Sequence, residues 1–154
     1  MLLALVPRPR PSPLSLISPS SLALALMWTP ISQSPELPPP AGAYSPGVRA
    51  GDFVFVSGQV PRDPATGEIE GTDTATQTRR VLDNLRRVLA AADAAMTDVV
   101  SVMVHLADAN DWGEFNAVYQ EFFQAPFPSR TVVGAQLRGI RVEVTAVAYA
   151  PRPR

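Results

Sequence analysis

Proline is distributed unevenly along this chain, and its distribution limits where a folded domain can form. Ten of the seventeen prolines lie in residues 1 to 40, where they remove backbone donors and interrupt helices and strand pairing. The same segment is rich in serine and leucine but has no helical or alternating period. We therefore expect residues 1 to 40 to be a disordered leader, residues 41 to 150 to form one domain, and residues 151 to 154 to be a tail.

Three interpretations of the leader stay open. It is an inert tail or a misassigned extension of a protein that starts at Met27, or it is disordered with a role of its own. The third is a targeting signal, because Arg8 and Arg10 precede an apolar stretch, although Pro19 interrupts that stretch. We expect a cytoplasmic protein, with organellar targeting by the leader as the open alternative.

The residue types that the chain lacks exclude several kinds of chemistry. It has no cysteine, no lysine and a single histidine. These absences exclude disulfides, a thiolate nucleophile, cysteine-ligated metals and Schiff-base catalysis. We therefore expect no metal and no organic cofactor. No apolar run reaches the roughly 18 to 20 residues of a membrane span, so we expect no membrane partner.

The charge of residues 41 to 150 argues against a nucleic-acid partner. This region contains nine arginines and thirteen acidic residues, a net charge of 9 − 13 = −4. Binding to phosphates relies on basic residues that collect on one surface. The arginines here are instead scattered or paired with acids along one predicted helix.

The hydrophobic pattern predicts an α+β domain with the order β-β-α-β-α-β-β and both helices on one face of the sheet. Alternating β-branched and aromatic residues indicate the strands, and apolar residues three and four apart indicate the helices. The predicted strands are 46 to 50, 52 to 58, 99 to 106, 129 to 136 and 140 to 150, and the predicted helices are 72 to 94 and 111 to 124.

Two helices cover only one face of such a sheet, yet the opposite face also carries large apolar residues. We therefore expect that face to meet another subunit. A ligand site at the junction of two subunits would be partly buried, and an arginine binds a carboxylate more strongly there than in bulk water.

Arg130 and Glu143 are the main candidates for chemistry. Arg130 enters a predicted strand from a corner stiffened by Pro128, and a guanidinium fixed there is suited to bind a small carboxylate through two hydrogen bonds. Its alternative is a salt bridge on an edge strand. Glu143 lies on the polar face of the last strand, where it orients a water or pairs with Arg138 or Arg141.

Four residues are candidates for ligand contact, each with a plainer alternative. Ser57 and Gly58 end a strand, and glycine there permits close approach of backbone N–H groups to a ligand, or is a turn residue. Tyr44 offers an aromatic face to a planar ligand, or anchors the N-terminal segment. Asn116 borders the apolar stripe of the second helix, where a surface amide is the default.

Other polar and aromatic residues are expected to be structural. His105 has no carboxylate at metal-ligand spacing along the sequence, so we interpret it as structural. We expect the aromatic residues of the second helix to lie in the core or at an interface rather than to form a stacking platform; they are Trp112, Phe115 and Tyr119. The charged residues of the first helix are expected to be a solvated surface; they are Arg79, Arg80, Asp83, Arg86 and Arg87.

Four stretches of the sequence together resemble the RidA (YjgF) family, the reactive intermediate deaminases once labelled L-PSP endoribonucleases. They are AGAYSPGVRAGDFVFVSGQVPRDPATGEI at 41 to 69, QTRRVLDNLRRVLAAADAAMTDVVSVMVHLAD at 77 to 108, FNAVYQEFF at 115 to 123 and FPSRTVVGAQLRGIRVEVTAVA at 127 to 148. The resemblance implies the chorismate mutase-like YjgF fold. That fold is a six-stranded, mostly antiparallel mixed sheet with two helices on one face, assembled as a homotrimer with pockets at subunit clefts.

The resemblance also implies an activity, the hydrolysis of 2-imino acids to 2-keto acids and ammonia without a cofactor. In the matching positions, Arg130 would bind the substrate carboxylate and Glu143 would position water. The other contacts would come from Tyr44, Ser57, Gly58 and Asn116. A non-catalytic protein that binds small carboxylates with the same clefts is the alternative. RNA cleavage, which an older family label suggests, suits an acidic domain without lysine poorly.

Overall fold

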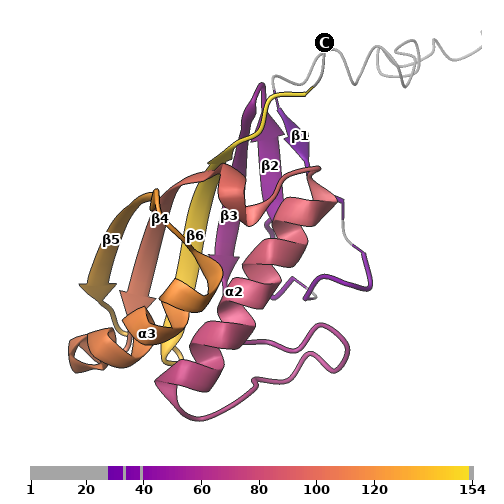
Figure 1. Ribbon diagram of the computed structural model, residues 1–154. Coiled ribbons are helices and arrows are strands. Elements are labelled where there is room, and N and C mark those ends of the chain that lie inside the picture. The colour runs from indigo at the N-terminus through magenta and orange to yellow at the C-terminus, as the bar shows by residue number, and fades with distance from the viewer. Residues whose placement is uncertain (1–27, 33, 39, 153–154) are drawn as a thin grey trace, which may run out of the picture.

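The computed structural model describes residues 28 to 32, 34 to 38 and 40 to 152. Six strands form one sheet in the order β1-β2-β3-β6-β4-β5, and neighbouring strands are antiparallel except for the parallel pair β4 and β5. Two helices, α2 and α3, lie side by side on one face of this sheet (Figure 1). The α+β class and the six-stranded mixed sheet implied by the resemblance are confirmed.

The bounds of the elements are close to those that the sequence pattern predicts. The strands are β1 (Thr29–Pro30), β2 (Gly47–Ala50), β3 (Phe53–Gln59), β4 (Val99–Leu106), β5 (Ser129–Gly134) and β6 (Val142–Tyr149). The helices are α2 (Thr74–Ala91) and α3 (Trp112–Phe122), and short 3₁₀ turns at Met96–Asp98 and Ala109–Asp111 precede β4 and α3.

The start and end of α2 have clear local causes. The carboxylate of Asp73 accepts a hydrogen bond from the backbone N–H of Thr76 and thereby caps the helix N-terminus. The helix ends three residues before the predicted Ala94, because Asp93 adopts a positive φ of 54° and the N–H of Ala94 bonds back to the carbonyl of Leu89. The apolar stripe of α2 is buried against the sheet as predicted.

Alternation along β4 predicts that Val100, Val102, Val104 and Leu106 share one face, and the structure differs from this prediction in one position. Val102, Val104 and Leu106 are buried under the helices as expected, but Val100 is 45% exposed and Val99 is buried instead. The register with β6 shifts between Val99 and Ser101. Such an irregularity reverses the direction of the side chains that precede it, so the alternation fails there.

The expected leader contributes to the domain, which is a correction of the boundary at residue 41. Residues 29 and 30 form β1, which pairs with β2 at the edge of the sheet, and Ile31 and Leu37 are buried in the core. Gly47 allows this contact, because a Cβ there would lie 2.7 Å from the Phe55 carbonyl oxygen and 2.8 Å from Ile31 Cδ1. The interpretations of residues 1 to 27 concern a part of the chain outside the described residues.

The face of the sheet opposite the helices carries exposed apolar side chains, as the sequence suggests. Six large ones are each more than 40% exposed; they are Phe53, Phe55, Val100, Met103, Val133 and Tyr149. We call this surface the open face. Within the described residues, no helix has the length and apolar character needed to cross a membrane.

Candidate functional site

The guanidinium of Arg130 lies against the aromatic stripe of α3. The side chain projects from β5 toward the helices, and its Cζ atom lies 4.4 Å from the ring centroid of Tyr119, 5.7 Å from Phe115 and 5.9 Å from Trp112. One hydrogen bond fixes it further, from Nη2 to Oδ1 of Asn116 at 2.9 Å. The sequence-based alternative, a salt bridge on an edge strand, is not formed with any described carboxylate.

Arg130 and its neighbours line a cleft between α3 and the corner that leads into β5. The cleft has a volume of about 320 Å³ and is lined by Asn116, Tyr119, Gln120, Phe127, Pro128 and Arg130. The lining is mostly apolar, with a single cation at its edge and an amide beside it. A planar carboxylate with a small apolar substituent fits the chemistry of this surface.

Among the residues that line this cleft, Tyr119 has a shifted pKa. The residue is 3% exposed, and its hydroxyl has no hydrogen-bond partner among the described residues. Burial raises the pKa of Tyr119 above its ordinary value of 10.0, and the positive charge of Arg130 opposes part of that rise. The hydroxyl is therefore neutral at physiological pH and does not compete with a ligand for Arg130.

Glu143 and Gly58 meet on the other face of the sheet. Val142 and Val144 are fully buried under the helices, so Glu143 between them projects to the open face. A Cβ added at Gly58 would lie 3.0 Å from Glu143 Cδ and would overlap Oε1. The absence of a side chain at Gly58 therefore leaves the space that the carboxylate occupies. The cross-strand neighbour of Glu143 on β4 is His105.

Tyr44 and Ser57 lie beside this second group. The hydroxyl of Ser57 donates a hydrogen bond of 2.7 Å to the carbonyl of Ser45, which ties the segment before β2 to β3. The ring of Tyr44 is 50% exposed, and it shares a small cleft with Gly58. Tyr44 therefore lies beside Gly58 and is about half exposed to solvent.

The six candidate residues form two groups, and Arg130 and Glu143, one in each, project from opposite faces of the sheet. We call Arg130 and Asn116 the anchor group, and Tyr44, Ser57, Gly58 and Glu143 the acid group. Strand β4 lies between β5, which carries Arg130, and β6, which carries Glu143 (Figure 1). A single copy of the chain therefore does not bring Arg130 and Glu143 to one ligand.

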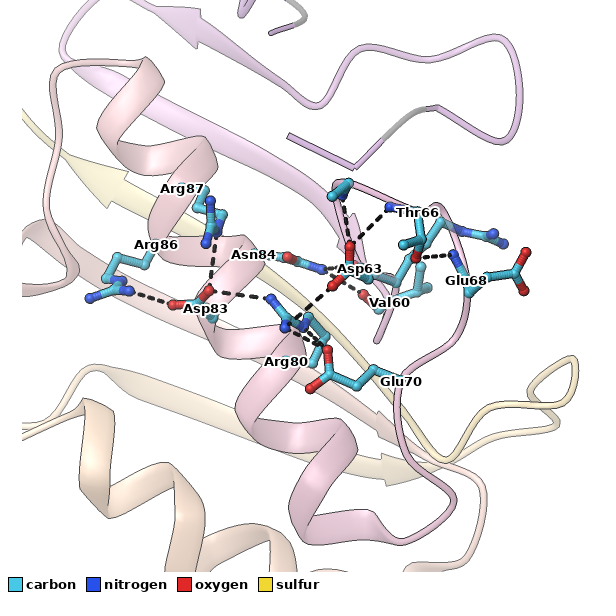
Figure 2. Close-up of polar contacts among 12 residues, drawn as sticks. Val60, Asp63, Thr66, Glu68, Glu70, Arg80, Asp83, Asn84, Arg86 and Arg87 are labelled. Atoms are coloured by element: carbon cyan, nitrogen blue, oxygen red, sulfur yellow. Dashed lines mark hydrogen bonds and ion pairs between the residues drawn. The ribbon is translucent and has the colours of Figure 1, made fainter. Parts of the chain in front are cut away.

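The charged surface of α2 is separate from both groups. Figure 2 shows Arg80 between Glu70 and Asp63 of the preceding loop, and Asp83 in contact with Arg86 and Arg87. Each of these arginines has a carboxylate partner. The prediction of a solvated surface holds for Arg86, whose side chain is 61% exposed, but the side chains of Arg80 and Asp83 are only 18% and 22% exposed. No group of three or more potential metal ligands occurs among the described residues.

Comparisons with known proteins agree with this fold and these motifs. The family model described as Endoribonuclease L-PSP matches residues 35 to 150. A RutC family protein of Pyrococcus horikoshii is 42% identical over 114 residues, which are 73% of this chain and 90% of the relative. The crystal structure of RidA from a Psychrobacter species has a TM-score of 0.72 and 32% identity, and the match covers 76% of this chain and 96% of that one. The chain belongs to the RidA family.

Other RidA-family relatives carry names that bear on activity. A rat protein named 2-iminobutanoate/2-iminopropanoate deaminase is 37% identical over 115 residues, which are 73% of this chain and 84% of the relative. The YjgF gene product of Escherichia coli has a TM-score of 0.73 with 34% identity, covering 79% of this chain and 98% of that structure. The region matched by the family model, residues 35 to 150, includes both groups of candidate residues.

Sequence reasoning missed the surroundings of Arg130. The stripe of Trp112, Phe115 and Tyr119 was expected in the core or at an interface, and Phe115 and Tyr119 are indeed buried. Their contact with the guanidinium was not expected, because helical spacing defines the stripe but not the strand that packs beside it. The pairing of Arg130 with Asn116, fourteen residues apart, depends on the same packing.

Proposed function

We propose that this RidA-family protein is a hydrolase acting on C=N bonds, which converts reactive 2-imino acids such as 2-iminopropanoate and 2-iminobutanoate to 2-keto acids and ammonia. The observation that carries the proposal is the state of Arg130, a partly buried guanidinium in an apolar cleft that pairs with no described carboxylate. An unpaired cation in such surroundings favours an anionic ligand. The names of the mammalian relatives support the same substrate class.

The working site requires at least two copies of the chain. The anchor group and the acid group lie on opposite faces of the sheet, so a ligand held by Arg130 would meet Glu143 only from a neighbouring copy. The exposed apolar side chains of the open face give such a copy a surface to pack on. We propose a homotrimer with one site at each junction, in agreement with the expectation from the family.

Arg130 positions the substrate in the proposed reaction. Its free N–H groups bind the carboxylate, and Asn116 holds the guanidinium in place through its Oδ1 atom. The protonated imine carbon next to that carboxylate is already electrophilic, so the reaction needs orientation and a water rather than a metal or an organic cofactor. The flat ring of Tyr44 would cover the planar substrate.

Glu143 transfers protons in the proposed reaction. The water oxygen forms a bond to the imine carbon while Glu143 accepts a proton from that water, which gives a neutral carbinolamine nitrogen. Glu143 then returns the proton to this nitrogen. The C–N bond breaks with its electron pair leaving on ammonia, the hydroxyl becomes the carbonyl of the keto acid, and its proton is released to solvent or ammonia.

The test is release of ammonia and keto acid from 2-iminobutanoate generated in situ by an amino-acid oxidase. We expect the wild type to accelerate hydrolysis over buffer, Arg130→Ala to raise KM strongly and Glu143→Gln to lower kcat by about 100-fold or more. Arg86→Ala is the matched control, because it removes an exposed arginine from the outer surface of α2. Hydrolysis by the wild type at the buffer rate would exclude the proposal.

A second candidate is a protein that binds small carboxylates without turnover. The anchor group favours it, since Arg130 and Asn116 lie together within one copy of the chain without Glu143. Saturable binding of 2-oxobutanoate by a wild type that lacks deaminase activity would support this candidate. Cleavage of RNA at low salt, where phosphate attraction is strongest, would instead support the older family label.

A further inference from the structure

The direction of the Arg130 guanidinium needs an explanation. An arginine side chain has many rotamers, and only one hydrogen bond to a described residue, the one to Asn116, restrains this one. A carboxylate clamp works only when the planar fork already points at the ligand. Another source of order must therefore act on the guanidinium.

Three aromatic rings supply that order. Trp112, Phe115 and Tyr119 are spaced by three and four residues, so they share one stripe of α3. All three ring centroids lie within 5.9 Å of Arg130 Cζ, inside the distance of about 6 Å over which cation–π attraction acts. Attraction to the rings restrains the guanidinium, and among the described residues only Nη2 donates a hydrogen bond, so Nε and Nη1 remain available to an anion.

Burial in the core does not explain the place of Trp112. Phe115 and Tyr119 are 0% and 3% exposed, so packing in the core is enough to explain their positions. Trp112, in contrast, is 48% exposed. An indole on the first turn of α3 would bury more apolar surface if it packed between the helix and the sheet. Here it stays half in solvent and beside Arg130, which is the arrangement expected if the cation holds it.

We propose that Trp112 is a positioning residue, and that Trp112, Phe115 and Tyr119 form an aromatic cradle that orients the guanidinium of Arg130 toward the cleft. This inference deepens the proposed function and rests on it for the identity of the ligand. The cradle acts on binding of the carboxylate and not on the proton transfers at Glu143. Its loss therefore raises the Kd and the KM and leaves kcat nearly unchanged.

The experiment compares Trp112→Leu, Trp112→Phe and Arg130→Ala. Trp112 is the suitable position because it is exposed, so its removal leaves the core intact, whereas Phe115 and Tyr119 are buried. The chain has one other tryptophan, the exposed Trp28, and Trp28→Phe is the matched control for loss of an indole. The first readout is the Nε–H signal of Arg130 in an NMR spectrum, assigned by its absence in Arg130→Ala.

We expect ring currents to displace the chemical shift of this signal in the wild type and in Trp112→Phe. In Trp112→Leu, the chemical shift should move toward the values of exposed arginines. The second readout is the Kd of 2-oxobutanoate, which we expect to rise about three- to tenfold in Trp112→Leu, as loss of a cation–π contact predicts, and to recover in Trp112→Phe. Trp28→Phe should match the wild type in both.

The outcomes separate the cradle from the proposed function. An Arg130 signal that stays in place in Trp112→Leu overturns the cradle, and so does an unchanged Kd in Trp112→Leu when Arg130→Ala abolishes binding. Equal binding by the wild type and Arg130→Ala, or no binding by the wild type, overturns the carboxylate anchor of the proposed function. In that case the NMR signal, which needs no ligand, still decides whether the cradle orients Arg130.

Discussion

Gly58 and Glu143 show how one missing side chain makes room for another. A methyl group at position 58 would overlap Glu143 Oε1, the end of a flexible side chain that moves more easily than the backbone. We expect Gly58→Ala to fold normally, to displace the carboxylate and to lower the deaminase kcat about 10- to 100-fold. Gly113→Ala is the control, since nothing lies within 4 Å of a Cβ added there. Wild-type kcat in Gly58→Ala would contradict this role of the glycine.

Arg49 is a structural counterpart to Arg130. It is 5% exposed, and it donates hydrogen bonds to the carbonyl of Ala150 and to that of Ala92 at the C-terminal end of α2. Its charge also stabilises that negative end of the helix. We expect Arg49→Met to lower the free energy of unfolding by about 2 to 4 kcal/mol, because two buried carbonyls lose their donors. Urea denaturation measures the change, and a loss below about 0.5 kcal/mol, as at an exposed arginine, would refute it.

At the candidate site, the sequence predicts the strand faces of the residues better than the contacts between elements. Arg130 follows a proline corner and Glu143 alternates with buried valines, so residue type and strand face were predictable. The side chains that contact Arg130 were not predictable, because Asn116 and Trp112 reach it through the packing of α3 on β5. Periodicity describes one element at a time and contains no information on that contact.

At the scale of elements, the sequence predicts long periodic segments well and short or irregular ones poorly. The α2 stripe and the alternation of β6 agree with the structure along their whole length. The two-residue strand β1 has no period to detect, and proline at its second position argues against pairing. It forms because the N–H of Ile31 bonds to the carbonyl of Gly47 at the open edge of β2.

The carboxylates around α2 predict how stability depends on pH. Burial raises the pKa of Asp83, but the hydrogen bonds and positive charges of Arg87 and Arg86 together outweigh this effect and lower the pKa (Figure 2). Backbone N–H groups lower the pKa of Asp63 and Asp73, and Arg79 lowers that of Glu121. A carboxylate whose pKa is lower in the folded state stabilises the fold above its unfolded value, and this contribution is lost as pH falls through the folded value.

We therefore expect the free energy of unfolding to be nearly constant from neutral pH down to about pH 5 and to fall below about pH 4. Urea denaturation across this range measures it. Asp83→Asn should be less stable than the wild type at neutral pH but should lose less on acidification, because asparagine does not titrate. Parallel pH profiles of the two proteins would show that the contacts of Asp83 with Arg86 and Arg87 contribute nothing.

At the scale of the whole molecule, the division of the candidate residues between two faces means that the proposed activity would depend on assembly. Arg130 lies under the helices beside β5, and Glu143 lies on the open face of β6. The sequence predicted that the open face would meet another subunit, since two helices cannot cover both faces. It did not predict that the anchor and acid groups would be divided between the faces, because that depends on the order of the strands in the sheet.

This division predicts that two variants, each with almost no activity at substrate concentrations below the wild-type KM, restore activity when they assemble together. Arg130→Ala keeps its acid group and Glu143→Gln keeps its anchor group, so a junction is complete when the Glu143→Gln copy supplies the anchor group and the Arg130→Ala copy supplies the acid group. If the two variants are unfolded together, mixed in equal amounts and refolded, random assembly gives intact sites at roughly a quarter of the junctions. We expect about a quarter of the wild-type deaminase activity in the mixture and almost none in either variant alone.

Mixing the folded variants should restore activity only as fast as subunits exchange. A refolded mixture that is as inactive as its components would mean that Arg130 and Glu143 act within one chain or in different sites.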